Sequence, residues 1–466
     1  MRYFICVLVV LLCPLPLPAA ERPNILFVYL DDMGWKDTGF AGSDFYETPH
    51  LDRLARGGLV FTNAYSCAAV CSPARASLLS GQYTPRHGIF NVGTGPRGDA
   101  RYRRLAHVPV RSDLRPEIVT WAEALKGQGY RTALFGKWHL GVDPRTQGFD
   151  VVIEARELAG GGRHYMPDGT YLTDELTSRT IGFIRANRDG PWVAYLAHRA
   201  VHTPLQPKKE LLPKYRKKPP AELHKNVAMA TMVQAVDDGV GRLVAALKEL
   251  GLRDRTAIFF SSDNGGNCDG GTDMDPLWGY KGTYYEGGIR VPMFVHWPGV
   301  VAPGQTTDEP VIGVDFYPTF LEMTGAERPD QPLDGKSLLP LLAGKVKTLG
   351  QRPLYWHFPG YLETFSTCDK DEQRDPLFRT RPCSIIRLGP WKLHEYFEDG
   401  ALELYNLDED IRERHNLADR QPERRKAMHA RLKAWRDAIG APAPTERNPR
   451  YDPAAEAAAI QRRLKQ

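Results

Sequence analysis

Two pairs of oxygen-bearing side chains follow apolar runs of the sequence. Asp31 and Asp32 come directly after one such run, residues 24–30, and Asp263 and Asn264 follow another. Carboxylate and amide oxygens are the ligands that calcium and magnesium prefer, and the cysteine or clustered histidine ligands of a zinc site do not accompany them. Either pair alone would be ordinary turn chemistry. Together they predict one calcium ion, because magnesium demands a stricter octahedral geometry.

The segment around Cys71 has the pattern of a helix N-terminus. Ser72 can cap the helix, Pro73 suits its first position, and Gly81 can end it. Backbone N–H groups and the helix dipole favour anions at such a position, and Arg75 lies one turn further on. A buried structural cysteine is the ordinary alternative. The polar flanks and the placement of Arg75 favour a functional Cys71 instead.

The elements that must position these residues predict an α/β fold. Apolar runs suited to strands buried on both faces of a parallel sheet lie at residues 24–30, 131–135, 192–196 and 256–261. Helical stretches lie between them, at residues 49–56, 116–127 and 224–250. Ligands of such sheets bind beyond the carboxyl ends of the strands. Each of these four runs leads into a polar cluster, so we expect the four clusters to form one site: they are Asp31-Asp32, Gly136-Lys-Trp-His139, His198 with His202, and Asp263-Asn-Gly-Gly266.

The pattern changes at about residue 351. Short strand-like runs separated by turn signals are followed by a charged helical stretch at residues 420–438. We therefore predict a large, mainly parallel sheet flanked by helices in a catalytic domain over residues 21–350. A smaller C-terminal subdomain with an antiparallel sheet and a helix would occupy residues 351–450, and a tail residues 451–466.

Residues 1–20 have a basic start, a short apolar run and small residues at the end, which is typical of a secretory signal peptide. The run is too short to span a membrane, and no later stretch is long and apolar enough, so we expect a periplasmic or secreted protein without a stable membrane span. A lipid anchor at Cys13 is the alternative, although the large Leu12 disfavours it. The net charge of +5 is too small to indicate a nucleic-acid binder.

Five cysteines would remain after removal of the leader, an odd number that suggests a separate role for one of them. They are Cys67, Cys71, Cys268, Cys368 and Cys383. Cys368 and Cys383 could close a loop, although the spacing alone fixes no pairing.

These motifs together resemble the type I, formylglycine-dependent sulfatases, which include the arylsulfatases and belong to the alkaline phosphatase superfamily. Cys71-Ser-Pro-Ala-Arg75, continued by Ser77-Leu-Leu-Ser-Gly81, resembles the formylglycine signature. Further segments that resemble the family are residues 23–32, 136–141, 262–265, 281–292 and 402–418. The resemblance covers nearly the whole chain after the leader and implies an alkaline phosphatase-like fold.

The resemblance also implies a sulfatase mechanism. A maturation enzyme would oxidise Cys71 to formylglycine, and one hydroxyl of the hydrated aldehyde would attack sulfur. Its implied ligands for one calcium ion are Asp31, Asp32, the oxidised Cys71, Asp263 and Asn264. Its implied catalytic residues are Arg75, Lys137 and Lys281 on the sulfate oxygens, Lys281 or His202 as the acid for the leaving alcohol, and His139 as the base that allows sulfate to leave.

Some alternatives stay open. His198 lies four residues before His202, so either histidine could be the catalytic one. A phosphoesterase of the same superfamily and a non-catalytic binder of sulfated glycans are the competing functions; the former would carry a serine or threonine nucleophile and two zinc ions. The expected substrate is a sulfated carbohydrate or an aryl sulfate. The basic residues after His202 could meet further anionic groups of a glycan or simply be solvated: they are Lys208, Lys209, Lys214, Arg216, Lys217 and Lys218.

Overall fold

The structure, a computed structural model, describes residues 22–160, 163–364, 374 and 376–465. The predicted signal peptide, with Cys13, and Cys368 lie outside these residues. The main sheet has eight strands, and its central part is parallel. In spatial order they are β5 (Val151–Glu154), β4 (Arg131–Gly136), β6 (Trp192–Ala197), β1 (Asn24–Leu30), β7 (Thr256–Ser262), β8 (Met293–His296), β2 (Leu59–Phe61) and β9 (Gln305–Thr307). Only β8 runs antiparallel to its neighbours, so the predicted mainly parallel sheet is confirmed.

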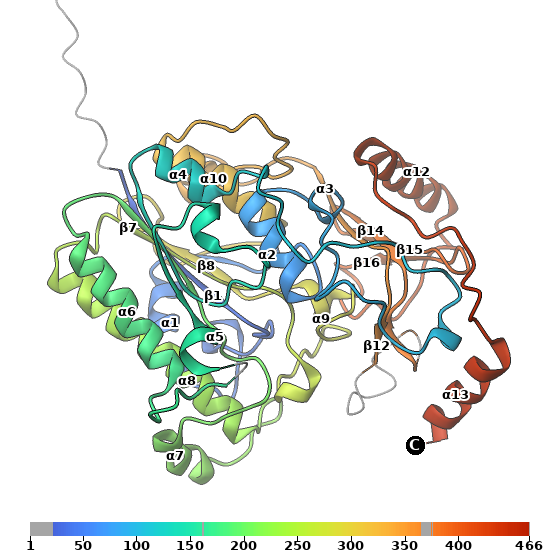
Figure 1. The fold of residues 1–466 in the computed structure, drawn as a ribbon, viewed down its shortest axis with the longest axis horizontal. Coiled ribbons are helices and arrows are strands. Elements are labelled where there is room, and N and C mark those ends of the chain that lie inside the picture. The colour runs from blue at the N-terminus through green and yellow to red at the C-terminus, as the bar shows by residue number, and fades with distance from the viewer. Residues whose placement is uncertain (1–21, 161–162, 365–373, 375, 466) are drawn as a thin grey trace, which may run out of the picture.

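Helices cover both faces of this sheet (Figure 1). One face carries α2 (Cys71–Ser80), α4 (Trp121–Gly127) and α10 (Phe316–Thr324), and the other carries α1 (Pro49–Arg56), α6 (Leu172–Ala186) and α8 (Val227–Glu249). Alternate residues of β1 enter the two cores: Phe27 packs with the first set of helices and Val28 with the second. This period of two on a strand buried on both sides explains why its sequence is a continuous apolar run.

Two predicted helix starts differ from the structure. The helix expected from residue 116 begins at Trp121, because Thr120 and Glu123 form a capping box there. The cap predicted at Ser72 is wrong: Cys71 is itself the first residue of α2, and the extended Val70 takes the cap position without a side-chain hydrogen bond. Cys71 is therefore closer to the free N–H groups of the helix than the sequence suggested.

The C-terminal part forms a separate antiparallel sheet, also as predicted. Its strands, in spatial order, are β11 (Pro353–Phe358), β14 (Cys383–Leu388), β15 (Trp391–Tyr396) and β16 (Leu402–Asn406). Helix α12 (Pro422–Ile439) packs Met428 and Leu432 against it. The predicted tail contains α13 (Pro453–Lys465), which Glu456 anchors through an ion pair with Arg381 at 2.9 Å.

Shorter elements complete the chain. They are β3 (Ala64–Tyr65), β10 (Val311–Ile312), β12 (Leu362–Glu363), β13 (Phe378–Thr380), α3 (Thr84–His87), α5 (Ala155–Ala159), α7 (Leu212–Lys217), α9 (Glu286–Ile289) and α11 (Leu339–Leu342). Among the residues described, no helix combines the length and the apolar character needed to cross a membrane.

The structure corrects the suggested disulfide. Cys383 is a free thiol buried inside β14, so it does not pair with Cys368. Cys268 is disulfide-bonded. Cys67 and Cys71 are also free and buried.

Candidate active site

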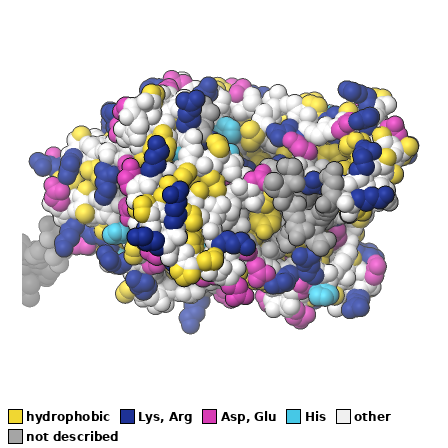
Figure 2. All heavy atoms as spheres, turned by 90° about the horizontal axis from the view of Figure 1, so that it is seen from below, with side chains coloured by type: hydrophobic (Ala, Val, Ile, Leu, Met, Phe, Trp, Pro, Cys, Tyr) yellow, Lys and Arg dark blue, Asp and Glu magenta, His cyan; other side chains and the backbone are white. Residues whose placement is uncertain are grey.

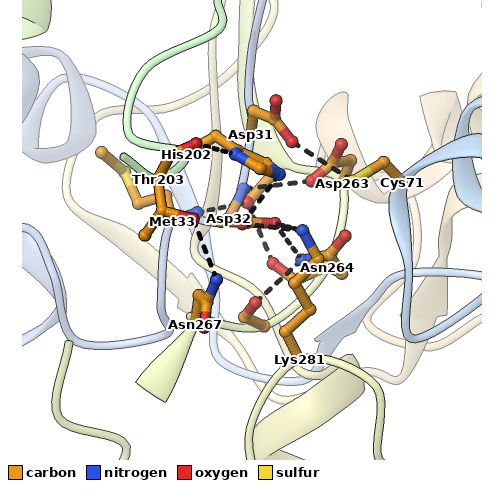
Figure 3. A network of polar contacts seen from close by, with 12 residues as sticks. Asp31, Asp32, Met33, Cys71, His202, Thr203, Asp263, Asn264, Asn267 and Lys281 are labelled. Atoms are coloured by element: carbon orange, nitrogen blue, oxygen red, sulfur yellow. Dashed lines mark hydrogen bonds and ion pairs between the residues drawn. The ribbon is translucent and has the colours of Figure 1, made fainter. Parts of the chain in front are cut away.

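Four oxygen-bearing side chains meet at the carboxyl edge of the main sheet. Strands β1 and β7 are parallel neighbours in which Leu30 pairs with Ser262, so the residues that follow them emerge side by side. Asp31, Asp32, Asp263 and Asn264 are each at most 2% exposed, and Figure 3 shows them around one point. The sequence-based prediction that the two pairs come together is confirmed in geometry.

The donor set fits a hard divalent cation. The side-chain oxygen of Asn264 is buried and has no hydrogen-bond partner among the described residues, while its nitrogen donates to Asp32 at 2.8 Å. A buried amide oxygen without a partner is costly unless something else satisfies it. Three carboxylates and this free oxygen are ligands of the kind that calcium takes.

The carboxyl groups titrate differently because their neighbours differ. Burial opposes the charge of Asp31, but Lys137 and His202 outweigh it and hold the pKa of Asp31 well below its usual range. Burial and the neighbouring Cys71 raise the pKa of Asp263 to about 8 despite Arg75. A bound divalent cation would favour the ionised form of each group.

Cys71 lies beside this cluster at the N-terminus of α2. Its Sγ is 3.4 Å from a carboxylate oxygen of Asp31, and ligand atoms of both residues lie within 4.8 Å of atoms of Asp32 and His202. Burial raises the pKa of the Cys71 thiol, but Lys137 and Lys281 outweigh it and lower the pKa below the usual value. The position therefore favours an anionic atom on residue 71.

Arg75 lies deeper than the predicted role requires. The resemblance implies that it binds sulfate oxygens, but its side chain is fully buried. Its Nε and one terminal nitrogen donate to Asp263, and the other terminal nitrogen donates to the Lys137 carbonyl. This geometry supports an orienting role for Arg75.

Two ammonium groups border the carboxylates. The Nζ of Lys137 lies 2.7 Å from Asp31, and the Nζ of Lys281 lies 2.7 Å from Asp32. Gly136 precedes Lys137 with φ +119°, and a Cβ there would lie 1.9 Å from the carbonyl oxygen of Ala197. Only glycine fits at this position, where the end of β4 lies beside Ala197 of the parallel strand β6, and this explains the glycine before Lys137.

The histidines separate clearly. His202 Nε2 lies 3.6 Å from Asp32, and its Nδ1 bonds the Thr203 carbonyl. Burial lowers the pKa of His202, but Asp31 and Asp32 outweigh it and raise the pKa to about 9. His198 is buried, neither of its ring nitrogens has a partner among the described residues, and burial lowers its pKa to about 3. Of His198 and His202, His202 is thus the one that lies at the site.

A cavity of about 590 Å³ opens at the same edge. It is lined by Lys137, His139 and His202, and His139 is exposed in it with φ +66°. Its wall also contains Ser72, which the sequence suggested only as a helix cap, and residues without a role assigned from the sequence, namely Ser112, Asp113, Glu154, Arg156 and Arg199. The one signal in the sequence was their place after a strand, since Glu154 ends β5 and Arg199 follows β6 at the carboxyl edge of the sheet.

A carboxylate cluster whose ligand atoms suit a divalent cation, beside a cysteine and two ammonium groups, is an arrangement suited to hydrolysing anionic esters. Known proteins narrow this class. Residues 23–326 match the sulfatase family, and residues 277–438 match the C-terminal part of N-sulphoglucosamine sulphohydrolase. The chain belongs to the sulfatase family and is an enzyme that hydrolyses sulfate esters, with the alkaline phosphatase-like fold of that family.

Three relatives illustrate the similarity. A Formosa agariphila sulfatase is 32% identical over 90% of this chain and 89% of its own length. Human N-acetylgalactosamine-6-sulfatase is 32% identical over 73% of this chain and 69% of its own. The crystal structure of Ps i-CgsB in complex with k-i-k-neocarrahexaose superposes with a TM-score of 0.74 at 28% identity, covering 95% of this chain and 98% of that one.

Proposed function

We propose that the chain is an exported sulfatase that hydrolyses a sulfate ester of a carbohydrate, using formylglycine made from Cys71 and one calcium ion. The observation that carries the proposal is the position of Cys71, the first residue of α2, with its Sγ 3.4 Å from Asp31 in the oxygen cluster. An oxygen on residue 71 would complete this ligand set. The formylglycine supplies a hydrated aldehyde, whose second hydroxyl gives sulfate an exit that a plain alcohol lacks.

The residues around position 71 divide the remaining work. Calcium, when bound by Asp31, Asp32, Asp263 and Asn264, would supply positive charge for the sulfate oxygens. Lys137, beside Asp31, and Lys281, beside Asp32, neutralise the charge that develops on those oxygens in the transition state.

Two histidines suit the proton transfers. His202 lies 3.6 Å from Asp32 and lines the cavity, so it can donate a proton to the leaving alcohol, with Lys281 as the alternative donor. His139 lines the same cavity and can take the proton of the second hydroxyl. Arg75 orients the Asp263 carboxylate through two hydrogen bonds.

A carbohydrate substrate is supported by the chemistry of the cavity wall. Carboxylate, guanidinium and hydroxyl groups share it, and such groups hydrogen-bond the hydroxyls of a sugar. The names of the human relative and of the neocarrahexaose complex point in the same direction. A two-zinc phosphoesterase is less well supported, because the candidate metal ligands Asp31, Asp32, Asp263 and Asn264 offer oxygens, whereas zinc sites usually include cysteine or histidine.

Peptide mass spectrometry tests the proposal. The protein is produced with and without a formylglycine-generating enzyme, and residue 71 is expected as the aldehyde only in the first preparation. Hydrolysis of an aryl sulfate, and not of an aryl phosphate, should follow the aldehyde content and should disappear with a calcium chelator. Full activity from protein that carries only the thiol would overturn the proposed mechanism.

A further inference from the structure

Arg199 stands in the wall of the active-site cavity with little of its hydrogen-bonding capacity used. It lies on the segment between β6 and His202, and its carbonyl accepts the backbone N–H of His202 at 3.0 Å. One terminal nitrogen donates to the Thr203 carbonyl at 3.3 Å, while its Nε is buried without a partner. No carboxylate among the described residues forms an ion pair with it. Its other donors can therefore serve a ligand in the cavity.

Arg156 is a second cation on the same wall. It is exposed in α5, directly after β5, and forms no ion pair with any described residue. In the sheet order β5–β4–β6–β1, the strand before Arg156 (β5) is three strand spacings, about 14 Å, from the strand before Asp31 (β1). The strand before Arg199 (β6) is one spacing, about 5 Å, from β1. Arg199 therefore lies nearer to the carboxylate cluster, and Arg156 lies farther from it.

Half of the basic side chains in the segment after His202 are engaged in ion pairs away from the cavity. Lys208 pairs with Asp174 at 2.6 Å, and Lys214 and Lys218 both pair with Glu47. On the face shown in Figure 2, basic and acidic side chains are interspersed and no field of one sign stands out. The residues of this segment do not line the cavity, whereas Arg156 and Arg199 do.

Acidic groups in the cavity argue against a general anion trap. Asp113 and Glu154 line it together with the arginines. Carboxylates accept hydrogen bonds from hydroxyls and repel a ligand that is anionic throughout. The wall therefore suits a hydroxylated ring on which negative charge is confined to particular positions.

We propose that the cavity selects a sulfated sugar carrying a second anionic group, a carboxylate or a further sulfate, which Arg199 binds through its forked donors. Arg156 contacts an anionic group farther from the scissile ester. This inference rests on the proposed function and specifies its substrate class. A guanidinium binds a planar carboxylate or a tetrahedral sulfate through paired hydrogen bonds to two of its oxygens, so either group fits this site.

Equilibrium binding to the Cys71→Ala protein tests the inference without any turnover. The ligands are a sulfated disaccharide with an otherwise neutral partner sugar, its uronate counterpart, and its disulfated counterpart. We expect both dianionic ligands, or one of them, to bind more tightly than the monosulfated disaccharide. Adding Arg199→Ala should weaken that binding roughly 10- to 100-fold and reduce the preference, with Arg199→Lys intermediate because it keeps charge without the fork. Arg156→Ala should weaken it less.

Arg216→Ala is the matched control, because Arg216 is exposed on α7 and outside the cavity. It should leave affinity and aryl sulfate hydrolysis unchanged. Thermal unfolding of each variant verifies the fold. Equal affinity for all three ligands, or equal losses on all three in Arg199→Ala, would overturn the inference. Failure of the proposed function would show separately, as a lack of aryl sulfate hydrolysis by the matured wild-type enzyme.

Discussion

Arg75 directs two nitrogens at one carboxylate oxygen of Asp263, at 3.0 and 2.8 Å, and both side chains are fully buried. The remaining terminal nitrogen donates to the carbonyl of Lys137. One guanidinium therefore joins α2, the end of β7 and the end of β4. It neutralises a buried carboxylate and fixes its direction, which is what a cation-binding oxygen requires.

Replacing Arg75 should damage stability and calcium binding together. Arg75→Ala leaves Asp263 buried without its partner, so we expect a loss of roughly 3–5 kcal/mol in the free energy of unfolding. Arg75→Lys keeps the charge but cannot bond Asp263 and the Lys137 carbonyl at once, so its loss should be smaller. Denaturant unfolding with and without calcium measures both effects. Wild-type stability of Arg75→Ala would contradict the orienting role.

Asn264→Ala tests the calcium site through its unpartnered oxygen. Removing one ligand atom should raise the dissociation constant for calcium roughly tenfold or more. Asn267→Ala is the matched control, because Asn267 bonds Thr203 and lies apart from the four ligands in Figure 3. The readout is the rise in melting temperature during a calcium titration. If calcium leaves the melting temperature of the wild-type protein unchanged, the metal assignment fails.

A pair of histidine variants distinguishes the two candidates. His202→Gln removes the ring that lies 3.6 Å from Asp32 and should lower kcat by roughly 10²–10⁴-fold. His198 is buried, does not line the cavity, and has no side-chain hydrogen bond to any described residue, so His198→Gln should change stability far more than kcat. Steady-state kinetics beside thermal unfolding measures both. A greater kcat loss in His198→Gln would reverse the assignment.

The contact between the two sheets predicts a pH dependence of stability. Burial opposes the charge of Glu286, but Lys392 and Arg290 outweigh it and lower its pKa to about 2. Since the pKa in the unfolded chain is about 4.3, the stabilisation is complete above that value and is lost as the pH falls towards 2. Glu286→Gln should cost roughly 3 kcal/mol at pH 7.

Denaturant unfolding at several pH values tests this window. The stability difference between wild type and Glu286→Gln should shrink as the pH falls from about 4.3 to 2. Glu249→Gln, which breaks the exposed pair with Arg185, should cost less than about 1 kcal/mol. A difference that stays constant over this range would show that Glu286 is not held by its charge.

The sequence was informative wherever chemistry follows a buried strand. Asp31 and Asp263 are distant in sequence, yet parallel strands β1 and β7 end at the same edge, so the pattern alone brought them together. The apolar runs located the strands because both faces of the main sheet are buried.

The directions of side chains were not encoded in those patterns. Arg75 was expected at the sulfate, but its partner Asp263 lies 188 residues away and draws it inward. Arg199 was missed because its place in the cavity wall depends on the path of the loop that carries it. Backbone hydrogen bonds from Asp31 to Ala200 and from Val201 to Asp31 fix that path. Hydrophobic periodicity carries no information about such a loop.

Cys71→Ser gives the most direct test of why position 71 needs its modification. The serine oxygen can form a bond to sulfur while the bond from sulfur to the aryl oxygen breaks and the aryl alcohol leaves with a proton. The new sulfate ester then persists, because its carbon has no second hydroxyl through which sulfate could be expelled. We expect a burst of at most one equivalent of aryl alcohol, and mass spectrometry should find the peptide that contains position 71 sulfated on the introduced serine. Cys71→Ala should give no burst, and sustained turnover by Cys71→Ser would refute the requirement for the aldehyde.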